Sequence, residues 1–120
     1  LDEWLDARRS NAAALSSAIA TNQKLGAPQI RPDSEHAWHQ YCIQADNIES
    51  FLQHMADHDI AARQIYPVPC HQHPVYNEHR QANDDFPITS RLSKQLVSIP
   101  VHHGLTDVEL NRIVRALGSC

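Results

Sequence analysis

Helical and strand-like patterns alternate along this chain, and this alternation constrains its fold more than any other feature. Apolar residues recur at the spacing of one helix face in some segments, and form alternating or aromatic and β-branched runs in others. The sequence therefore predicts an α+β fold, an α/β-type small domain. It would have about three short strands in one sheet with helices packed on it, in the order α-β-α-β-loop-α-β-α. In chain order, the predicted elements are residues 2–20, 36–44, 47–58, 60–66, 89–95, 96–101 and 106–118.

Two of the predicted helices carry start signals. Asp46 and Glu49 form a D-x-x-E pattern before the helix at 47–58, and Thr106 with Glu109 forms a capping box before the last helix. Gly118 suits the position just after that helix. The predicted buried stripe of the last helix is Leu110, Ile113, Val114 and Leu117. The first helix is less regular, because Arg8 interrupts its apolar face.

Two segments lack periodicity. Residues 21–35 hold glycine, prolines and polar residues, so we expect a connector there. Residues 67–87 contain four prolines, and a loop of that length inside a small domain is usually functional. Trp4 and Trp38 are expected to anchor the packing, because indole rings bury a large apolar area. His102 and His103 are expected in a solvated turn.

Composition limits the function classes. The 120 residues suit a single domain, and 10 Lys and Arg against 14 Asp and Glu give a net charge of −4, which argues against a nucleic-acid surface. No apolar run is long enough to span a membrane. Three widely spaced cysteines fit a reducing compartment, so we expect the cytoplasm. The chain begins at Leu1 without methionine, so we expect either an excised piece of a longer protein or a chain that lacks its natural start.

The residues by themselves do not make a complete enzyme. Cys70, His71 and His73 could bind zinc, but no second paired motif accompanies them, and hydrogen-bonded loop histidines are the alternative interpretation. Ser90 and Ser98 lack the setting of a nucleophile. The two lysines, Lys24 and Lys94, lie in polar segments unlike those of Schiff-base lysines. We therefore predict no catalytic, cofactor-binding or metal-binding residue in this chain.

Five segments, in order and at matching spacing, resemble the C-terminal portion of the DegT/StrS-type nucleotide-sugar aminotransferases, pyridoxal-phosphate enzymes of fold type I. They are His36–Tyr41 (HAWHQY), Tyr66–His71 (YPVPCH), Asp85–Pro87 (DFP), Leu96–Val101 (LVSIPV) and Leu105–Thr106 (LT). The opening Leu1–Arg9 resembles the helix that links the large and small domains of that family. The resemblance thus implies one domain, residues 1–120, with a linking helix at 1–22 and an α/β core at 36–118.

The resemblance implies a divided enzyme. The family's Schiff-base lysine and phosphate-binding residues belong to the large domain, so pyridoxal phosphate is expected in the full-length parent and not on this chain alone. The small domain closes over the cleft, and Tyr66 and His71 match a loop that faces it, as substrate-binding residues. Implied partners are a nucleotide-sugar, an amino-acid donor and a second copy of the chain in a homodimer or other self-association.

The sequence departs from the family pattern at two positions. Ile65 stands where a histidine commonly precedes the Tyr-Pro pair, and Asp59 stands where a glycine commonly precedes Ile60. Structural roles also remain open: Tyr66 could close an edge of the core, and His71 could bond backbone carbonyls. The alternative to an aminotransferase domain is a stand-alone remnant that binds a partner protein or itself.

Overall fold

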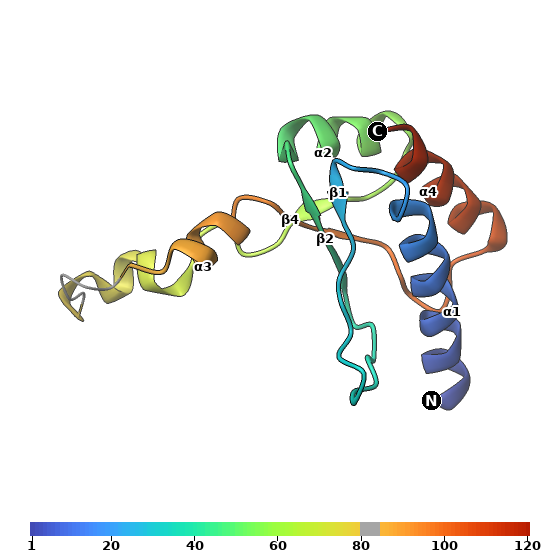
Figure 1. Cartoon of the computed structure of the whole chain (residues 1–120), viewed down its shortest axis with the longest axis horizontal. Helices are drawn as coiled ribbons and strands as arrows, with labels where there is room; N and C mark the ends of the chain where they lie inside the picture. Colours follow the sequence, from blue (N-terminus) through green and yellow to red (C-terminus); the bar gives the residue numbers. More distant parts are fainter. Residues whose placement is uncertain (80–84) are drawn as a thin grey trace.

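The computed structural model describes residues 1–79 and 85–120. Helices and strands form one layered core, and an arm built from residues 65–79 and 85–92 extends away from it (Figure 1). The helices are α1 (Asp2–Ile19), α2 (Ile48–Asp57), α3 (Pro87–Leu92) and α4 (Asp107–Ser119), with 3₁₀ turns η1 (Cys70–Gln72) and η2 (Pro74–His79). The strands are β1 (Leu25–Gly26), β2 (Tyr41–Ala45), β3 (Arg63–Gln64) and β4 (Leu96–Ile99).

The sheet is antiparallel, with the strand order β1-β2-β4-β3. Its two longest strands, β2 and β4, pair so that Tyr41 faces Ile99 and Ile43 faces Val97. All four of these side chains are buried, so the alternation read from the sequence does place one face of each strand in the core. The α+β class with helices on a small sheet is confirmed.

The sheet has four strands, one more than the three or so that the sequence predicted. β1 lies inside residues 21–35, which were expected to be a connector, and pairs Leu25 with Ala45 at the edge of the sheet. A strand of two residues is too short to show an alternating pattern. The strand forms because its backbone pairs with the end of β2. Just beyond this pairing, the Asp46 amide donates to the Lys24 carbonyl at 3.1 Å.

The predicted strand at 36–44 is shifted, because β2 begins only at Tyr41. Trp38 has a φ of 49°, in the left-handed region, and its amide donates to His36 Nδ1 at 2.9 Å. This local turn is incompatible with a sheet ladder, so residues 36–40 lie outside the strand. Trp38 is nevertheless buried in the core, as expected of a packing anchor.

The strand predicted at 60–66 is reduced to β3, which pairs Arg63 with Ser98 and Gln64 with Val97. The pairing ends near Tyr66, whose φ of 52° also lies in the left-handed region. This turn marks the junction between the core and the arm. Part of the loop predicted at 67–87 lies outside the described residues, which leave out 80–84.

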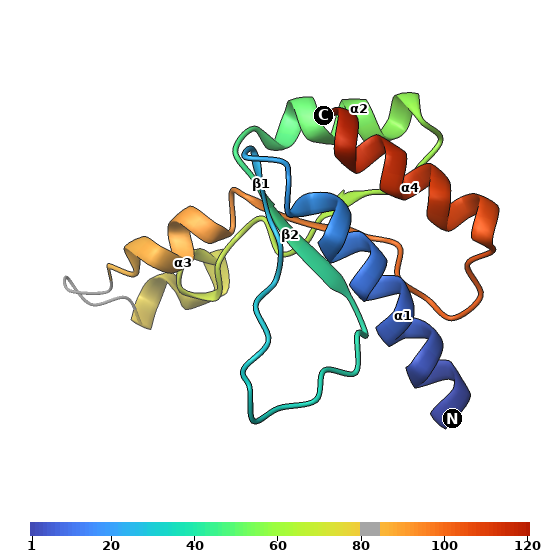
Figure 2. The ribbon, with the colours of Figure 1, turned by 45° about the vertical axis from the view of Figure 1, so that its right-hand side comes forward.

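Helices α1 and α4 pack side by side and run in the same direction over one face of the sheet (Figure 2). Asn11 Nδ2 donates to the His102 carbonyl at 3.0 Å near the start of α4, and Asn22 Nδ2 donates to the Leu117 carbonyl at 2.9 Å near its end. His54 of α2 lies 2.9 Å from the Ala116 carbonyl, so α2 packs at the end of α4. The buried helix residues include Leu15, Ile19, Phe51, Met55, Ile113 and Leu117.

The helix ends confirm one start signal and correct another. At α4, the Glu109 amide donates to Thr106 Oγ1 and the Thr106 amide donates to the Glu109 carboxylate, so the capping box is present. At α2, the cap is Asn47, whose side chain accepts from the Ser50 amide at 2.9 Å. The D-x-x-E pattern therefore lies one residue too early. Gly118 also lies inside α4, because that helix continues to Ser119.

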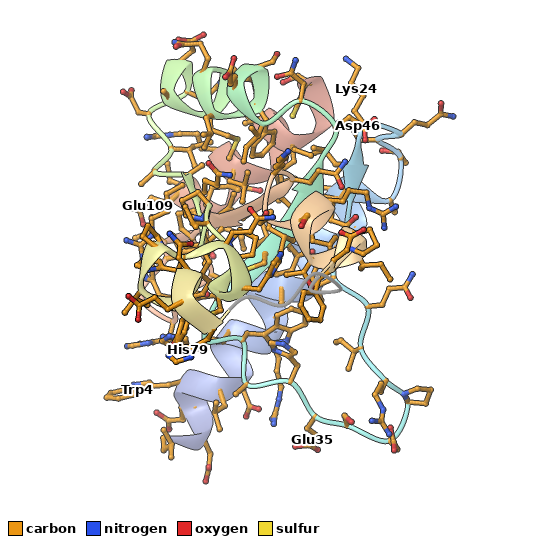
Figure 3. All side chains as sticks on the ribbon, turned by 90° about the vertical axis from the view of Figure 1, so that its left-hand side faces the viewer. Trp4, Lys24, Glu35, Asp46, His79 and Glu109 are labelled. Carbon is orange, nitrogen blue, oxygen red and sulfur yellow. The ribbon has the colours of Figure 1, made fainter. Side chains whose placement is uncertain are left out.

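Trp4 is not the packing anchor that the sequence predicted. Its side chain is 55% exposed, and its ring stacks on that of His103, with centroids 4.6 Å apart and the planes at 13°. Figure 3 shows Trp4 projecting outward from α1. The expectation for His102 and His103 is confirmed, because both are exposed in the turn before α4. Among the described residues, no helix is long and apolar enough to cross a membrane.

Candidate functional site

The arm carries the two residues predicted to bind substrate. It consists of an outgoing limb, residues 65–79, and a return limb, residues 85–92, and it faces the viewer in Figure 3 with His79 labelled on it. Tyr66 lies at its base, two residues after the end of β3, and His71 lies in η1. Prolines flank η1, at Pro69 and Pro74, and fix φ at both ends of this short turn.

The two limbs are tied by a small polar cluster around Ser90. Gln72 Nε2 donates to Ser90 Oγ at 3.0 Å, and Ser90 Oγ lies 3.4 Å from His71 Nε2. When Ser90 Oγ accepts from Gln72, its own proton is free to be donated to His71 Nε2. In that tautomer, Nδ1 of His71 carries the proton and can donate to a ligand.

His71 also packs against an aromatic side chain of the return limb. Its ring lies 4.8 Å from that of Phe86, at an interplanar angle of 57°. This contact and the bond to Ser90 hold the imidazole on two sides, so its orientation is set by the arm. His71 therefore bonds a side-chain hydroxyl, in place of the backbone carbonyls that the structural interpretation expected.

Tyr66 is the most exposed aromatic side chain of the described residues. Its side chain is 78% exposed, and no hydrogen bond or ring contact of that side chain is present within the described part of the chain. The alternative expectation that Tyr66 closes an edge of the core is therefore wrong. Its φ of 52° turns the backbone out of the sheet, and this turn keeps the ring away from the core.

The remaining candidates for chemistry are placed apart from one another. Lys24 and Lys94 are both exposed, and Lys24 Nζ donates to the Cys120 carbonyl at 3.4 Å. Burial raises the pKa of the Cys42 and Cys120 thiols, which keeps them protonated and unreactive. Within residues 1–79 and 85–120, no three His, Cys, Asp or Glu side chains gather where they could hold a metal ion. The zinc alternative thus finds no site in this part of the chain.

Sequence reasoning missed the partners of His71. Ser90 lacks the setting of a nucleophile in the sequence, yet its hydroxyl contacts both His71 and Gln72 in the structure. Ser90 is 19 residues from His71 along the chain, and no local pattern could indicate that the two limbs lie side by side. The one indication in the sequence was that Asp85–Pro87 resembles a segment of the family, because Phe86 of this segment contacts His71.

Comparison with known proteins identifies what this chain resembles. The model of the DegT/DnrJ/EryC1/StrS aminotransferase family matches residues 1–118. A dTDP-3-amino-3,6-dideoxy-alpha-D-galactopyranose transaminase from Aneurinibacillus thermoaerophilus is 28% identical over 110 residues, which are 92% of this chain and 30% of that protein. A dTDP-3-amino-3,4,6-trideoxy-alpha-D-glucose transaminase from Streptomyces venezuelae is 26% identical over 117 residues, 98% of this chain and 31% of that protein.

Solved structures share the fold. DesV of S. venezuelae matches with a TM-score of 0.91 at 24% identity, over 98% of this chain and 32% of that one. The sugar aminotransferase CalS13 of Micromonospora echinospora matches with a TM-score of 0.85 at 24% identity, over 98% and 31%. This chain therefore spans about a third of the length of the proteins it matches. Because the family model covers nearly all of its residues, the chain belongs to the DegT/DnrJ/EryC1/StrS aminotransferase family.

Proposed function

We propose that this chain is the small, C-terminal domain of a pyridoxal-phosphate-dependent sugar aminotransferase, and that its arm covers the cofactor and sugar cleft of the parent enzyme. The family match over residues 1–118 carries this proposal. In this assignment residues 1–22 link the domain to the rest of the enzyme, and residues 36–118 form its α/β core. A cytoplasmic location fits a biosynthetic enzyme with three free cysteines.

The substrate class follows from the relatives. Two of them are named as transaminases of dTDP-linked amino sugars. We infer a nucleotide-linked sugar as the acceptor and an amino acid as the amino donor for the parent enzyme. The chain contributes closure of the cleft and part of the acceptor pocket.

The residues of this chain do not fit the attachment of pyridoxal phosphate. Cofactor attachment in this enzyme class needs a lysine in apolar surroundings, and both lysines of the chain are exposed. No step of amino transfer is therefore assigned to its residues. The cofactor and the proton transfers belong to the parent's other domain, and the isolated chain is expected to be inactive.

Tyr66 and His71 are proposed to bind the sugar substrate. The Tyr66 hydroxyl makes no hydrogen bond to another described residue, and His71 is oriented by Ser90 and Phe86 so that Nδ1 can donate. Both side chains offer hydrogen bonds to sugar hydroxyls without taking part in the chemistry. Binding residues of this kind raise KM when they are removed and leave kcat nearly unchanged.

The test uses the complete enzyme encoded by the gene, with transamination of a nucleotide-sugar as the readout. Tyr66→Phe and His71→Gln should each raise KM about tenfold, the effect of losing one hydrogen bond to substrate. Tyr76→Phe is the matched control, because Tyr76 lies on the same limb in η2. Equal effects in all three variants, or a loss of kcat alone, would contradict the substrate-binding roles.

Self-association is the second candidate function, and exposed apolar side chains on the arm favour it. Val75 is 69% exposed and Ile88 is 66% exposed, on opposite limbs. Apolar surface of this kind favours contact with another protein or with a second copy of the chain, as a homodimer would provide. Light scattering after size-exclusion chromatography tests this. A dimer that Val75→Asp converts to monomer supports it, and a monomeric wild-type chain at high concentration opposes it.

A further inference from the structure

A groove of about 590 Å³ opens at one end of the sheet, where β2 begins and β4 ends. It is lined by residues from four segments of the chain: α1, the turn before β2, β3 with the residues before it, and the end of β4 with the residues after it. The residues that matter for its chemistry are Arg8, His39, Gln40, Arg63, Ser98 and His102.

The charge of this groove is opposite to that of the whole chain. Two arginines and two histidines line it, and no aspartate or glutamate is among its lining residues. The chain as a whole has a net charge of −4, so the groove does not reflect general basicity. Within the described residues, the side-chain ion pairs of arginine involve Arg9 and Arg31, while Arg8 and Arg63 have no carboxylate partner.

Arg8 is held in place by the fold. Its Nη1 donates to the Trp38 carbonyl at 2.8 Å, and Trp38 is itself only 5% exposed. One edge of the guanidinium is therefore fixed, and its other N–H groups remain available on the groove side. The far wall is tied to the same helix, because Asn11 Nδ2 donates to the His102 carbonyl at 3.0 Å. The interruption of the apolar face of α1 by Arg8 thus has a structural role.

We propose that this groove binds a phosphate group, either as inorganic phosphate or as part of a nucleoside diphosphate. The two guanidiniums, which have no carboxylate partner in the described part of the chain, suit an oxyanion, because each can donate two parallel hydrogen bonds. The histidines, the Ser98 hydroxyl and the Gln40 amide add donors for a third oxygen, which a phosphate has and a carboxylate lacks. The volume lies within the usual range for a small ligand. This site goes beyond the proposed function and does not depend on it.

The test measures anion binding to the 120-residue chain by calorimetry and by NMR of its arginine side chains. The probes are orthophosphate, pyrophosphate and dTDP, at constant ionic strength set with chloride. Arg63→Gln should weaken pyrophosphate binding about tenfold, as should Arg8→Gln. Arg63 makes no side-chain hydrogen bond within the described residues, so its variant should fold even if Arg8→Gln destabilises the chain. Arg115→Gln, on the exposed side of α4, makes the same change in net charge and should bind normally.

Each outcome decides the proposal. Saturable binding that is weakened by the two groove variants and not by Arg115→Gln supports the site. If dTDP and pyrophosphate bind equally, the groove recognises phosphate alone, and tighter dTDP binding assigns it to nucleotides; either result supports it. The proposal is overturned if binding does not saturate, or if all three variants weaken it equally. It is also overturned if a tetra-aspartate peptide binds more tightly than pyrophosphate, because the groove would then dock an acidic segment.

Discussion

Replacing Asp59 by glycine should stabilise this domain. Asp59 follows α2 and has a φ of 55°, which is unfavourable for residues with a side chain. The Ile60 amide donates to the Met55 carbonyl at 2.9 Å, and the Asp59 amide donates to the Ala56 carbonyl at 3.0 Å. These two bonds form a Schellman motif with Asp59 at the position that glycine normally takes. Asp59 therefore bears backbone strain that the glycine common in the family at this position would not bear.

The size of the effect can be worked from three contributions. A left-handed conformation costs a residue other than glycine roughly 1–2 kcal/mol, with aspartate toward the lower end. Glycine loses about 0.5–1 kcal/mol more in conformational entropy on folding. Removing a negative charge next to the C-terminal end of a helix adds about 0.3–1 kcal/mol of stability. The net expectation is a gain of about 1 kcal/mol, or a rise in Tm of roughly 4 °C.

The assay is urea unfolding of the wild type and three variants, followed by far-UV circular dichroism. Asp59→Gly should raise the free energy of unfolding. Asp59→Asn removes the charge and keeps a side chain that tolerates this conformation, so it should show only the smaller electrostatic gain. Asp57→Gly is the matched control, because Asp57 is the last residue of α2 and the variant removes a charge at the same helix end. There glycine costs roughly 0.5–1 kcal/mol and relieves no left-handed backbone, and the hydrogen bond from Gln53 Nε2 is lost, so we expect no net gain in stability.

The reasoning is refuted if Asp59→Gly is neutral or destabilising while Asp57→Gly behaves as expected. That result would mean that the carboxylate of Asp59 contributes an interaction that outweighs the backbone strain. If Asp59→Asn gives the whole gain, the charge and not the left-handed backbone is responsible. If only Asp59→Gly raises the free energy of unfolding by about 1 kcal/mol, the left-handed backbone of Asp59 is the source of the strain.

Four further predictions concern the core and the cap of α4. Thr106→Ala should lower the free energy of unfolding by about 1 kcal/mol in urea titrations. The hydrogen bonds from the backbone and side chain of Thr106 lower the pKa of Glu109. The stability they give is therefore present above pH 4.5 and is lost as pH falls through the lowered pKa. In Glu109→Gln, the free energy of unfolding should depend less on pH in this acid range. Burial raises the pKa of Tyr41 above 10.0, so its contribution is lost as pH rises through the raised value, and Tyr41→Phe should remove that alkaline loss. Trp38→Ala should lower stability by about 3–5 kcal/mol, whereas Trp4→Ala should have little effect in the same assay.

Features of the fold that depend on local pattern could be predicted from the sequence. The capping box at Thr106 was found because both of its partners lie within one helical turn. At α2 the same kind of reasoning chose Asp46, although Asn47 is the cap, because both residues can cap a helix and their neighbours do not distinguish them. The strand at β1 could not be found, since its two residues gain their structure from pairing with β2.

Features that depend on distant contacts were outside the reach of sequence patterns. The contact between His71 and Ser90 exists because the return limb folds back along the outgoing one. Arg8 lines the groove at the end of the sheet because α1 passes next to Trp38, which is 30 residues later in the chain and accepts a hydrogen bond from Arg8. Trp4 and Trp38 are both indole side chains, yet Trp4 is 55% exposed and Trp38 is 5% exposed. Trp38 packs on Tyr41 of β2, with ring centroids 5.2 Å apart, whereas Trp4 stacks on the exposed ring of His103.

Tyr66 both turns the backbone into the arm and exposes an aromatic ring with a hydroxyl group. Its left-handed backbone ends β3 and directs the following residues away from the core. The same turn exposes the ring, although a tyrosine of this size would normally gain stability from burial. Glycine would satisfy the turn without strain but would remove the ring and its hydroxyl. The presence of tyrosine at this position therefore favours a role for the side chain itself, in contact with a substrate or a protein surface beyond the core.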